Sequence, residues 1–153
     1  MRTIVYYSYS GNTREIVSRI KEKYDYDVLE IKPVIPYSDN YDEVVDRATT
    51  DTKNDYQPEI QKLDISKYDE IILCMPVWWY TVASPVNTFL HDYDLKDKVI
   101  IPVATNGGWL GHAIEDIEKK SGARIKNPVS LKFDGNELTE DDKFENWLKG
   151  LGD

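Results

Sequence analysis

The sequence predicts an α/β protein, a three-layer α/β/α sandwich around a five-stranded parallel sheet. Short apolar runs alternate five times with segments whose apolar residues recur at helical spacing. The runs are continuously apolar, which indicates strands buried on both faces between two layers of helices. The 153 residues contain no internal repeat and no interdomain linker, so we expect one domain over residues 1–153.

The predicted strands are the five apolar runs, at residues 4–7, 28–31, 71–75, 99–104 and 129–133. The predicted helices follow them in turn, with apolar stripes over residues 16–24, 41–48, 86–90, 110–117 and 144–151. Asn40 is the expected N-cap of the second helix, because Glu43 follows it at capping-box spacing. Pro102 lies inside a predicted central strand and has no N–H for the ladder, so we expect a bulge or an unpaired position there.

The chain is acidic: Lys and Arg number 19, Asp and Glu number 28, and the net charge is −9. Such a surface repels nucleic acid and anionic membranes and attracts basic proteins, although solubility alone also accounts for it. No apolar run approaches the roughly 20 residues of a membrane span, and the first residues lack a signal-peptide pattern. Cys74 is the only cysteine, which suits a reducing compartment. We expect a monomeric cytoplasmic protein with no nucleic-acid or membrane partner.

Ligands of open α/β sheets bind at the carboxyl ends of the strands, so the loops that follow the strands are the candidate sites. The loop after the first strand is Ser8-Tyr9-Ser10-Gly11-Asn12-Thr13. It provides three hydroxyls, an amide and a glycine just before a helix, whose free N–H groups and dipole attract a phosphate. An ordinary capped turn is the alternative interpretation.

The loop after the third strand carries three consecutive aromatic residues, in the segment Pro76-Val77-Trp78-Trp79-Tyr80. At least one of the three has to lie outside the core, and a flat side chain there suits stacking on a planar ring. A surface cluster or a protein interface is the alternative.

The loop after the fourth strand is rich in glycine, in the segment Thr105-Asn106-Gly107-Gly108-Trp109-Leu110-Gly111. Its glycines allow the backbone to approach a ligand closely, and Trp109 provides another ring. A flexible loop before a helix is the alternative. We expect the three loops to converge on one crevice.

These segments resemble the flavodoxin family over nearly the whole chain. The residues that carry the resemblance are 6–13, 76–79, 84–90 and 105–108, and the first segment is similar to the family's hydroxyl-glycine-x-threonine phosphate loop. The resemblance implies a short-chain, flavodoxin-like fold with strand order 2-1-3-4-5, an order for which flavodoxin with its FMN is itself the standard example. It also implies FMN as the cofactor, with the phosphate held by Ser8, Ser10, Asn12, Thr13 and nearby N–H groups. Residues 76–80 and 105–111 would then flank the isoalloxazine ring.

The leading functional hypothesis is a low-potential electron carrier that shuttles electrons between redox partner proteins with basic docking surfaces. The flavin carries the redox chemistry, so no residue of the chain is assigned a catalytic role. Aromatic stacking favours the flat oxidised ring, and the net charge of −9 disfavours the anionic reduced form. Both effects lower the redox potential of the flavin.

The resemblance is incomplete in the loops that flank the ring. Which of Trp78, Trp79, Tyr80 and Trp109 stacks on the flavin is open, and residues 105–108 lack the acidic run and tyrosine often found in electron-carrying flavodoxins. The alternative function is therefore an NAD(P)H-dependent quinone or FMN reductase on the same fold.

Other classes of site find no support in the sequence. A G-x-G-x-x-G fingerprint and a Walker A lysine are both missing. We predict no metal site, because His91 and His112 are far apart and have no cysteine neighbours. Cys74 is expected to be a small buried strand residue.

Overall fold

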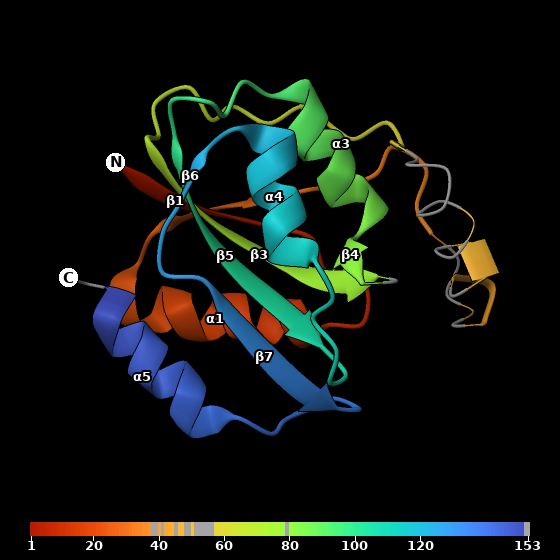
Figure 1. Cartoon of the computed structure of the whole chain (residues 1–153), viewed down its shortest axis with the longest axis vertical. Helices are drawn as coiled ribbons and strands as arrows, with labels where there is room; N and C mark the ends of the chain where they lie inside the picture. Colours follow the sequence, from red (N-terminus) through yellow and green to blue (C-terminus); the bar gives the residue numbers. More distant parts are fainter. Residues whose placement is uncertain are drawn as a thin grey trace.

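The computed structural model (Figure 1) describes residues 1–37, 40, 42–44, 46, 47, 50, 57–78 and 80–151. The strands are β1 (Arg2–Tyr6), β2 (Asp27–Glu30), β3 (Glu70–Trp78), β4 (Thr81–Val82), β5 (Val99–Asn106), β6 (Arg124–Ile125), β7 (Val129–Asp134) and β8 (Glu137–Leu138). The helices are α1 (Asn12–Tyr24), α3 (Ser84–Asp92), α4 (Ala113–Ser121) and α5 (Asp141–Leu151). No helix in this described part is long and apolar enough to cross a membrane.

The helix predicted over 41–48 is described only in part. Residues 42–44, 46 and 47 are helical, whereas Tyr41, Val45 and Ala48 lie outside the described residues. The Glu43 N–H donates to Asn40 Oδ1 over 3.2 Å, which confirms Asn40 as the N-cap.

The sheet differs from the predicted five-stranded parallel sheet. Within the described residues the sheet has eight strands in the order β2-β1-β3-β5-β7-β8, with β4 added beside β3 and β6 beside β5. The five long strands run parallel, but β4 and β8 are antiparallel to their neighbours, so the sheet is mixed. The prediction was wrong in strand number and in direction, because β4, β6 and β8 are only two residues long and too short to show an apolar pattern.

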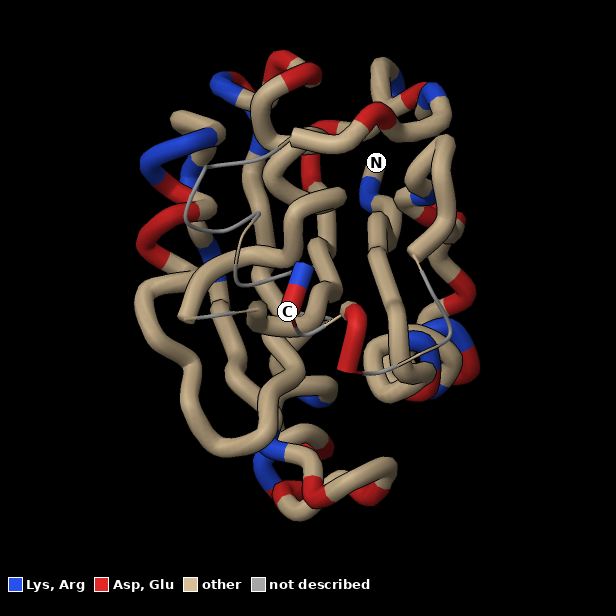
Figure 2. Tube along the Cα trace, turned by 90° about the vertical axis from the view of Figure 1, so that its right-hand side faces the viewer, with Lys and Arg blue, Asp and Glu red and all other residues tan. Residues whose placement is uncertain are grey.

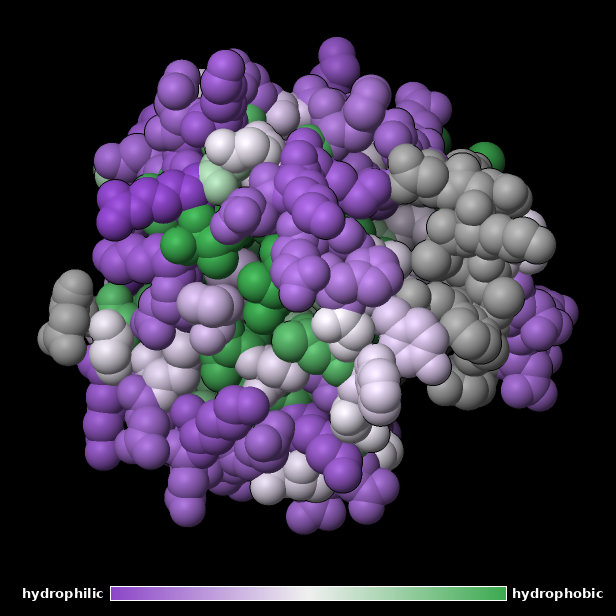
Figure 3. Space-filling model, viewed as in Figure 1, coloured by the Kyte–Doolittle hydropathy of each residue, from purple (hydrophilic) through white to green (hydrophobic). Residues whose placement is uncertain are grey.

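Helices cover both faces of the sheet, as the three-layer prediction requires (Figure 1). Val5 and Ile71 pack in one core with residues of α3 and α4, whereas their chain neighbours Ile4 and Ile72 pack in a second core with residues of α1 and α5. All four side chains are completely buried, which explains the continuous apolar runs. On the face in Figure 3, hydrophobic residues occupy a central region framed by hydrophilic ones.

Pro102 fits within β5 without a bulge. It pairs with Leu73 in an uninterrupted register between β3 and β5. On the other side, the pairing of β5 with β6 ends at Ile100 and the pairing with β7 begins at Val103. The expected unpaired position is thus confirmed, and the missing N–H of Pro102 interrupts no ladder.

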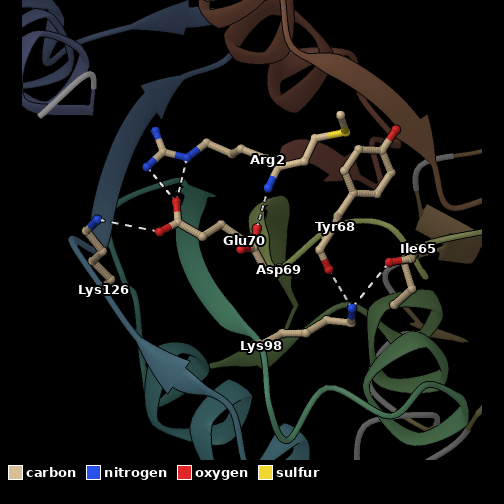
Figure 4. Close-up of polar contacts among 8 residues, drawn as sticks. Arg2, Ile65, Tyr68, Asp69, Glu70, Lys98 and Lys126 are labelled. Atoms are coloured by element: carbon tan, nitrogen blue, oxygen red, sulfur yellow. Dashed lines mark hydrogen bonds and ion pairs between the residues drawn. The ribbon is translucent and has the colours of Figure 1, made fainter.

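Ion pairs and hydrogen bonds connect the segments at the amino-terminal edge of the sheet (Figure 4). Arg2 contacts Glu70 at 2.6 Å, and Lys126, just after β6, approaches the same carboxylate at 3.7 Å. Arg2 Nη1 also donates to the carbonyl of Leu151 over 2.7 Å, and Lys98 Nζ donates to that of Tyr68 over 2.5 Å. The bond from Arg2 ties β1 to the last helix.

Candidate functional site

A cavity of about 490 Å³ opens where β1, β3, β5 and β7 end, and we call it the loop cavity. Its lining consists of Tyr9, Ser10, Asn12, Pro76, Val77, Trp78, Thr105, Asn106, Gly107, Phe133, Gly135 and Asn136. The first nine belong to the three loops selected from the sequence. The carboxyl ends of parallel strands share one edge of the sheet, and this places the three loops together.

The phosphate loop is shaped by Ser8 and Gly11. Ser8 Oγ accepts the N–H of Gly11 over 3.2 Å and that of Arg14 over 3.3 Å, so it organises the turn from inside. Gly11 is the N-cap of α1 and has a φ of +96°, a conformation that favours glycine. The sequence therefore forces a tight turn directly into a helix start.

Two N–H groups at the start of α1 remain available to a ligand. The first N–H groups of a helix have no acceptor inside it. Ser8 accepts that of Arg14, but for those of Asn12 and Thr13 the described part of the chain provides no acceptor. Ser10 and Asn12 also line the loop cavity. The loop thus offers neutral donors and a helix dipole to an anion.

Two polar side chains that the sequence assigned to the ligand bond to protein groups in this structure. The Thr13 hydroxyl is buried and lies 2.8 Å from the hydroxyl of Thr105. Asn12 Nδ2 donates to the carbonyl of Gly135 over 2.9 Å. Both bonds fasten the phosphate loop to neighbouring loops, so the hydroxyls of Ser8 and Ser10 remain to donate to a ligand.

The aromatic residues of the second loop separate into two groups. Trp78 lines the loop cavity and packs edge-on against Tyr7 and Tyr37, with ring centroids 5.7 and 5.3 Å apart. Tyr80 is 48% exposed and lies outside the cavity lining, edge-on to Trp109 at 5.7 Å. Trp79 lies outside the described residues.

The third loop contributes Thr105, Asn106 and Gly107 to the cavity, and Gly108, Trp109 and Gly111 lie beyond it. Asn106 Oδ1 accepts the N–H of Gly108 over 2.9 Å, and Asn106 Nδ2 donates to Ser130 Oγ over 2.8 Å. A Cβ added at Gly107 would meet no atom within 4 Å. The backbone at Gly107 therefore faces open space, as expected for a loop that binds a ligand.

Gly111 lets the third loop pack against the turn that contains Tyr80. A Cβ at Gly111 would lie 2.3 Å from the carbonyl oxygen of Tyr80, and the φ of Gly111 is +62°. The next residue, His112, donates its N–H to the same carbonyl over 2.8 Å. Asp116 Oδ2 accepts a hydrogen bond from the hydroxyl of Thr81 and also contacts His112 Nδ1. The two loops are thus clamped to each other.

Among the described residues that line the loop cavity there is no Asp, Glu, Lys, Arg or His. Charged residues of both signs are distributed over other parts of the chain (Figure 2). These residues suit a polar, planar ligand held by neutral donors. Cys74 is completely buried in β3, and burial raises the pKa of its thiol. Among the described residues, no group of three or more acidic, histidine or cysteine side chains could hold a metal ion.

The sequence reasoning missed the part of the lining contributed by Phe133, Gly135 and Asn136. These residues flank and form the turn between β7 and β8, which pair antiparallel. The two residues between these strands are Gly135-Asn136, a typical hairpin dipeptide that would have predicted this turn.

Known protein families and solved structures include proteins that are similar to this chain in sequence or in fold. The family model described as Flavodoxin matches residues 2–151. A candidate flavoprotein from Bacteroides eggerthii is 23% identical, with a TM-score of 0.80 over 99% of this chain and 98% of its own. A flavoprotein from Lactobacillus acidophilus, solved in complex with FMN, is 23% identical, with a TM-score of 0.73 over 95% and 97%.

A flavodoxin from Fusobacterium nucleatum bound to flavin mononucleotide is 13% identical, with a TM-score of 0.54 over 99% of this chain and 96% of its own. A search of curated protein sequences gives no match. The solved structures share the flavodoxin-like α/β fold, and the family model covers almost every residue. This chain belongs to the flavodoxin family.

Proposed function

We propose that this protein binds FMN in the loop cavity and serves as a low-potential electron carrier. The observation that carries the proposal is the combination of unpaired N–H groups at the start of α1 with an uncharged, partly aromatic cavity beside them. The similar proteins from Lactobacillus acidophilus and Fusobacterium nucleatum were solved with FMN, which supports this choice of ligand.

The donor set fits a flavin phosphate. The N–H groups of Asn12 and Thr13 and the hydroxyl of Ser10 would hold the phosphate, with the dipole of α1 favouring its charge. Tyr9, Trp78 and the backbone at Gly107 would flank the ring system. When bound, FMN supplies the one- and two-electron redox chemistry. The net charge of −9 opposes the added negative charge of reduction and so lowers the potential.

FMN binding can be measured by quenching of flavin fluorescence with Ser10→Ala and a matched control. We expect Ser10→Ala to weaken FMN binding by about tenfold, since it removes one hydrogen bond to a charged group. Ser18→Ala should leave binding unchanged, because Ser18 lies on the exposed side of α1 and bonds to the Arg14 carbonyl. Equal affinities for both variants would contradict the assignment of the phosphate site.

A redox titration of the FMN-loaded protein, followed by visible absorbance, tests the carrier role. We expect two separate one-electron stages and a midpoint potential below that of free FMN. A single two-electron stage together with steady NAD(P)H oxidation would instead support the NAD(P)H-dependent quinone or FMN reductase.

The proposed partners are redox proteins with basic docking surfaces, since the net charge of −9 accelerates encounters with positive surfaces. Transfer rates to such a partner should fall steeply as salt is added, because ions screen exposed charges. A rate independent of ionic strength would argue against charge-directed docking. We also propose a cytoplasmic location and a monomeric state, which fractionation and sedimentation can check.

A further inference from the structure

A second cavity, of about 320 Å³, adjoins the loop cavity. We call it the tyrosine cavity, because Tyr7, Tyr9 and Tyr37 lie in its lining. Tyr9 also lines the loop cavity, so one side chain is common to the two. A ligand in the tyrosine cavity would lie next to a ligand in the loop cavity.

The walls of the tyrosine cavity are flat and held in place. The rings of Tyr7 and Tyr37 each lie nearly perpendicular to the ring of Trp78, at interplanar angles of 86°. The guanidinium of Arg47 lies 5.0 Å from the centre of the Tyr37 ring. Burial, with smaller effects of Tyr37 and Tyr9, raises the pKa of Tyr7, so this phenol stays neutral. Pro33 and Pro36 add further apolar surface. Such walls suit a neutral planar ring.

Hydrogen-bond donors also line the cavity. Ser8 Oγ accepts two backbone N–H groups, which leaves its own proton to donate. The Gln61 N–H donates to the carbonyl of Lys32 over 2.8 Å and so fixes Gln61 beside the chain after β2. The side chains of Gln61 and Lys32 have no polar partner within the described residues. Glu30 also lines the cavity, and its carboxylate is paired with Arg14 at 3.4 Å. Three donors beside flat walls match a ring that bears carbonyl oxygens on its edge.

The size of the cavity narrows the class of ligand. Its volume lies near the lower end of the range for ligand pockets, about 300 to 1,000 Å³. This accommodates one or two fused rings and excludes a dinucleotide. We propose that the tyrosine cavity is a second ligand site, which takes a small planar aromatic molecule of the quinone class beside the flavin. This proposal depends on the proposed function in one respect, namely that the neighbouring loop cavity holds FMN.

The test uses the FMN-loaded protein and 2,3-dimethyl-1,4-naphthoquinone, whose methyl groups block addition of thiols. Calorimetry measures its binding, and 2,3-dimethylnaphthalene serves as a ligand of similar shape without carbonyls. We expect the quinone to bind and the hydrocarbon to bind at least tenfold more weakly, because it leaves the donors unpaired. We expect Tyr37→Ala to weaken quinone binding about tenfold by removing a wall, and Gln61→Leu several-fold by removing a donor.

Tyr26→Ala is the matched control, because Tyr26 is another half-buried tyrosine and stacks on Tyr24 away from both cavities. It should bind the quinone as the unaltered protein does. Wild-type affinity in Tyr37→Ala, equal binding of the hydrocarbon, or competition between the quinone and FMN for one site would overturn the proposal. Flavin absorbance reports FMN loading separately in every variant. Failure to load FMN would contradict the proposed function, whereas loading without quinone binding would contradict only this inference.

Discussion

Gly111→Ala tests whether the third loop depends on its close packing against Tyr80. A Cβ at this position would lie 2.3 Å from the carbonyl oxygen of Tyr80. The loop then has to move by about 1 Å to restore an ordinary contact. The hydrogen bond from the His112 N–H to that carbonyl, now 2.8 Å, would lengthen to about 3.8 Å and be lost.

The expected cost has two parts. A non-glycine residue in the left-handed conformation costs about 1–2 kcal/mol, and the lost hydrogen bond costs about 1 kcal/mol more. Gly122→Ala is the matched control, because its φ of +66° is almost the same, but its Cβ would meet only Lys96 Cγ at 3.9 Å. Gly122→Ala should therefore show the conformational cost alone.

Urea unfolding of the flavin-free protein measures both free energies of unfolding. We expect Gly111→Ala to lose at least about 1 kcal/mol more than Gly122→Ala. FMN affinity should fall about tenfold in Gly111→Ala, because the displaced loop flanks the ligand, and should stay unchanged in Gly122→Ala. If the two variants lost the same stability and bound FMN equally well, the proposed packing of the third loop against the turn at Tyr80 would be refuted.

Three further substitutions test the interior of the site and its neighbours. Thr13→Val should cost about 1–2 kcal/mol in urea unfolding by leaving the Thr105 hydroxyl with a weaker partner, and adding Thr105→Val should recover part of it. Since burial raises the pKa of Tyr7, stability should fall as pH rises above about 10, where the unfolded phenol ionises, and Tyr7→Phe should reduce the slope of this fall in alkaline unfolding curves. An identical slope would contradict that ionisation effect. Asp116→Asn should weaken FMN binding several-fold by loosening the contact with His112, and unchanged affinity would show that the contact is dispensable.

The positions of the strands and the proximity of the three loops were predictable, because both follow from strands whose side chains are buried on both faces of the sheet. Ile4 and Val5 face opposite cores, so both had to be apolar, and the same holds along β3 and β5. Parallel strands then bring the loops that begin at Ser8, Pro76 and Thr105 to one edge. The hydrophobic pattern and the parallel direction of the strands were enough to predict this arrangement of strands and loops.

The orientation of particular side chains was not predictable. Tyr80 has a φ of +66°, which is rare outside glycine, and Tyr80 is not among the residues that line the cavity with Trp78. The hydroxyl of Thr13 meets that of Thr105 across 92 residues of sequence, and no local pattern reveals such a partner. The contact of Trp78 with Tyr37 likewise depends on a polar segment far from it in the chain.

The comparison of FMN with riboflavin tests the phosphate site most directly, because the two ligands differ only in the phosphate. Quenching of flavin fluorescence gives the Kd of each for the flavin-free protein. If the loop from Ser8 to Thr13 holds the phosphate, FMN should bind about 100-fold or more tightly than riboflavin. Equal affinities for the two flavins, or binding of neither, would contradict the assignment of this cavity to FMN.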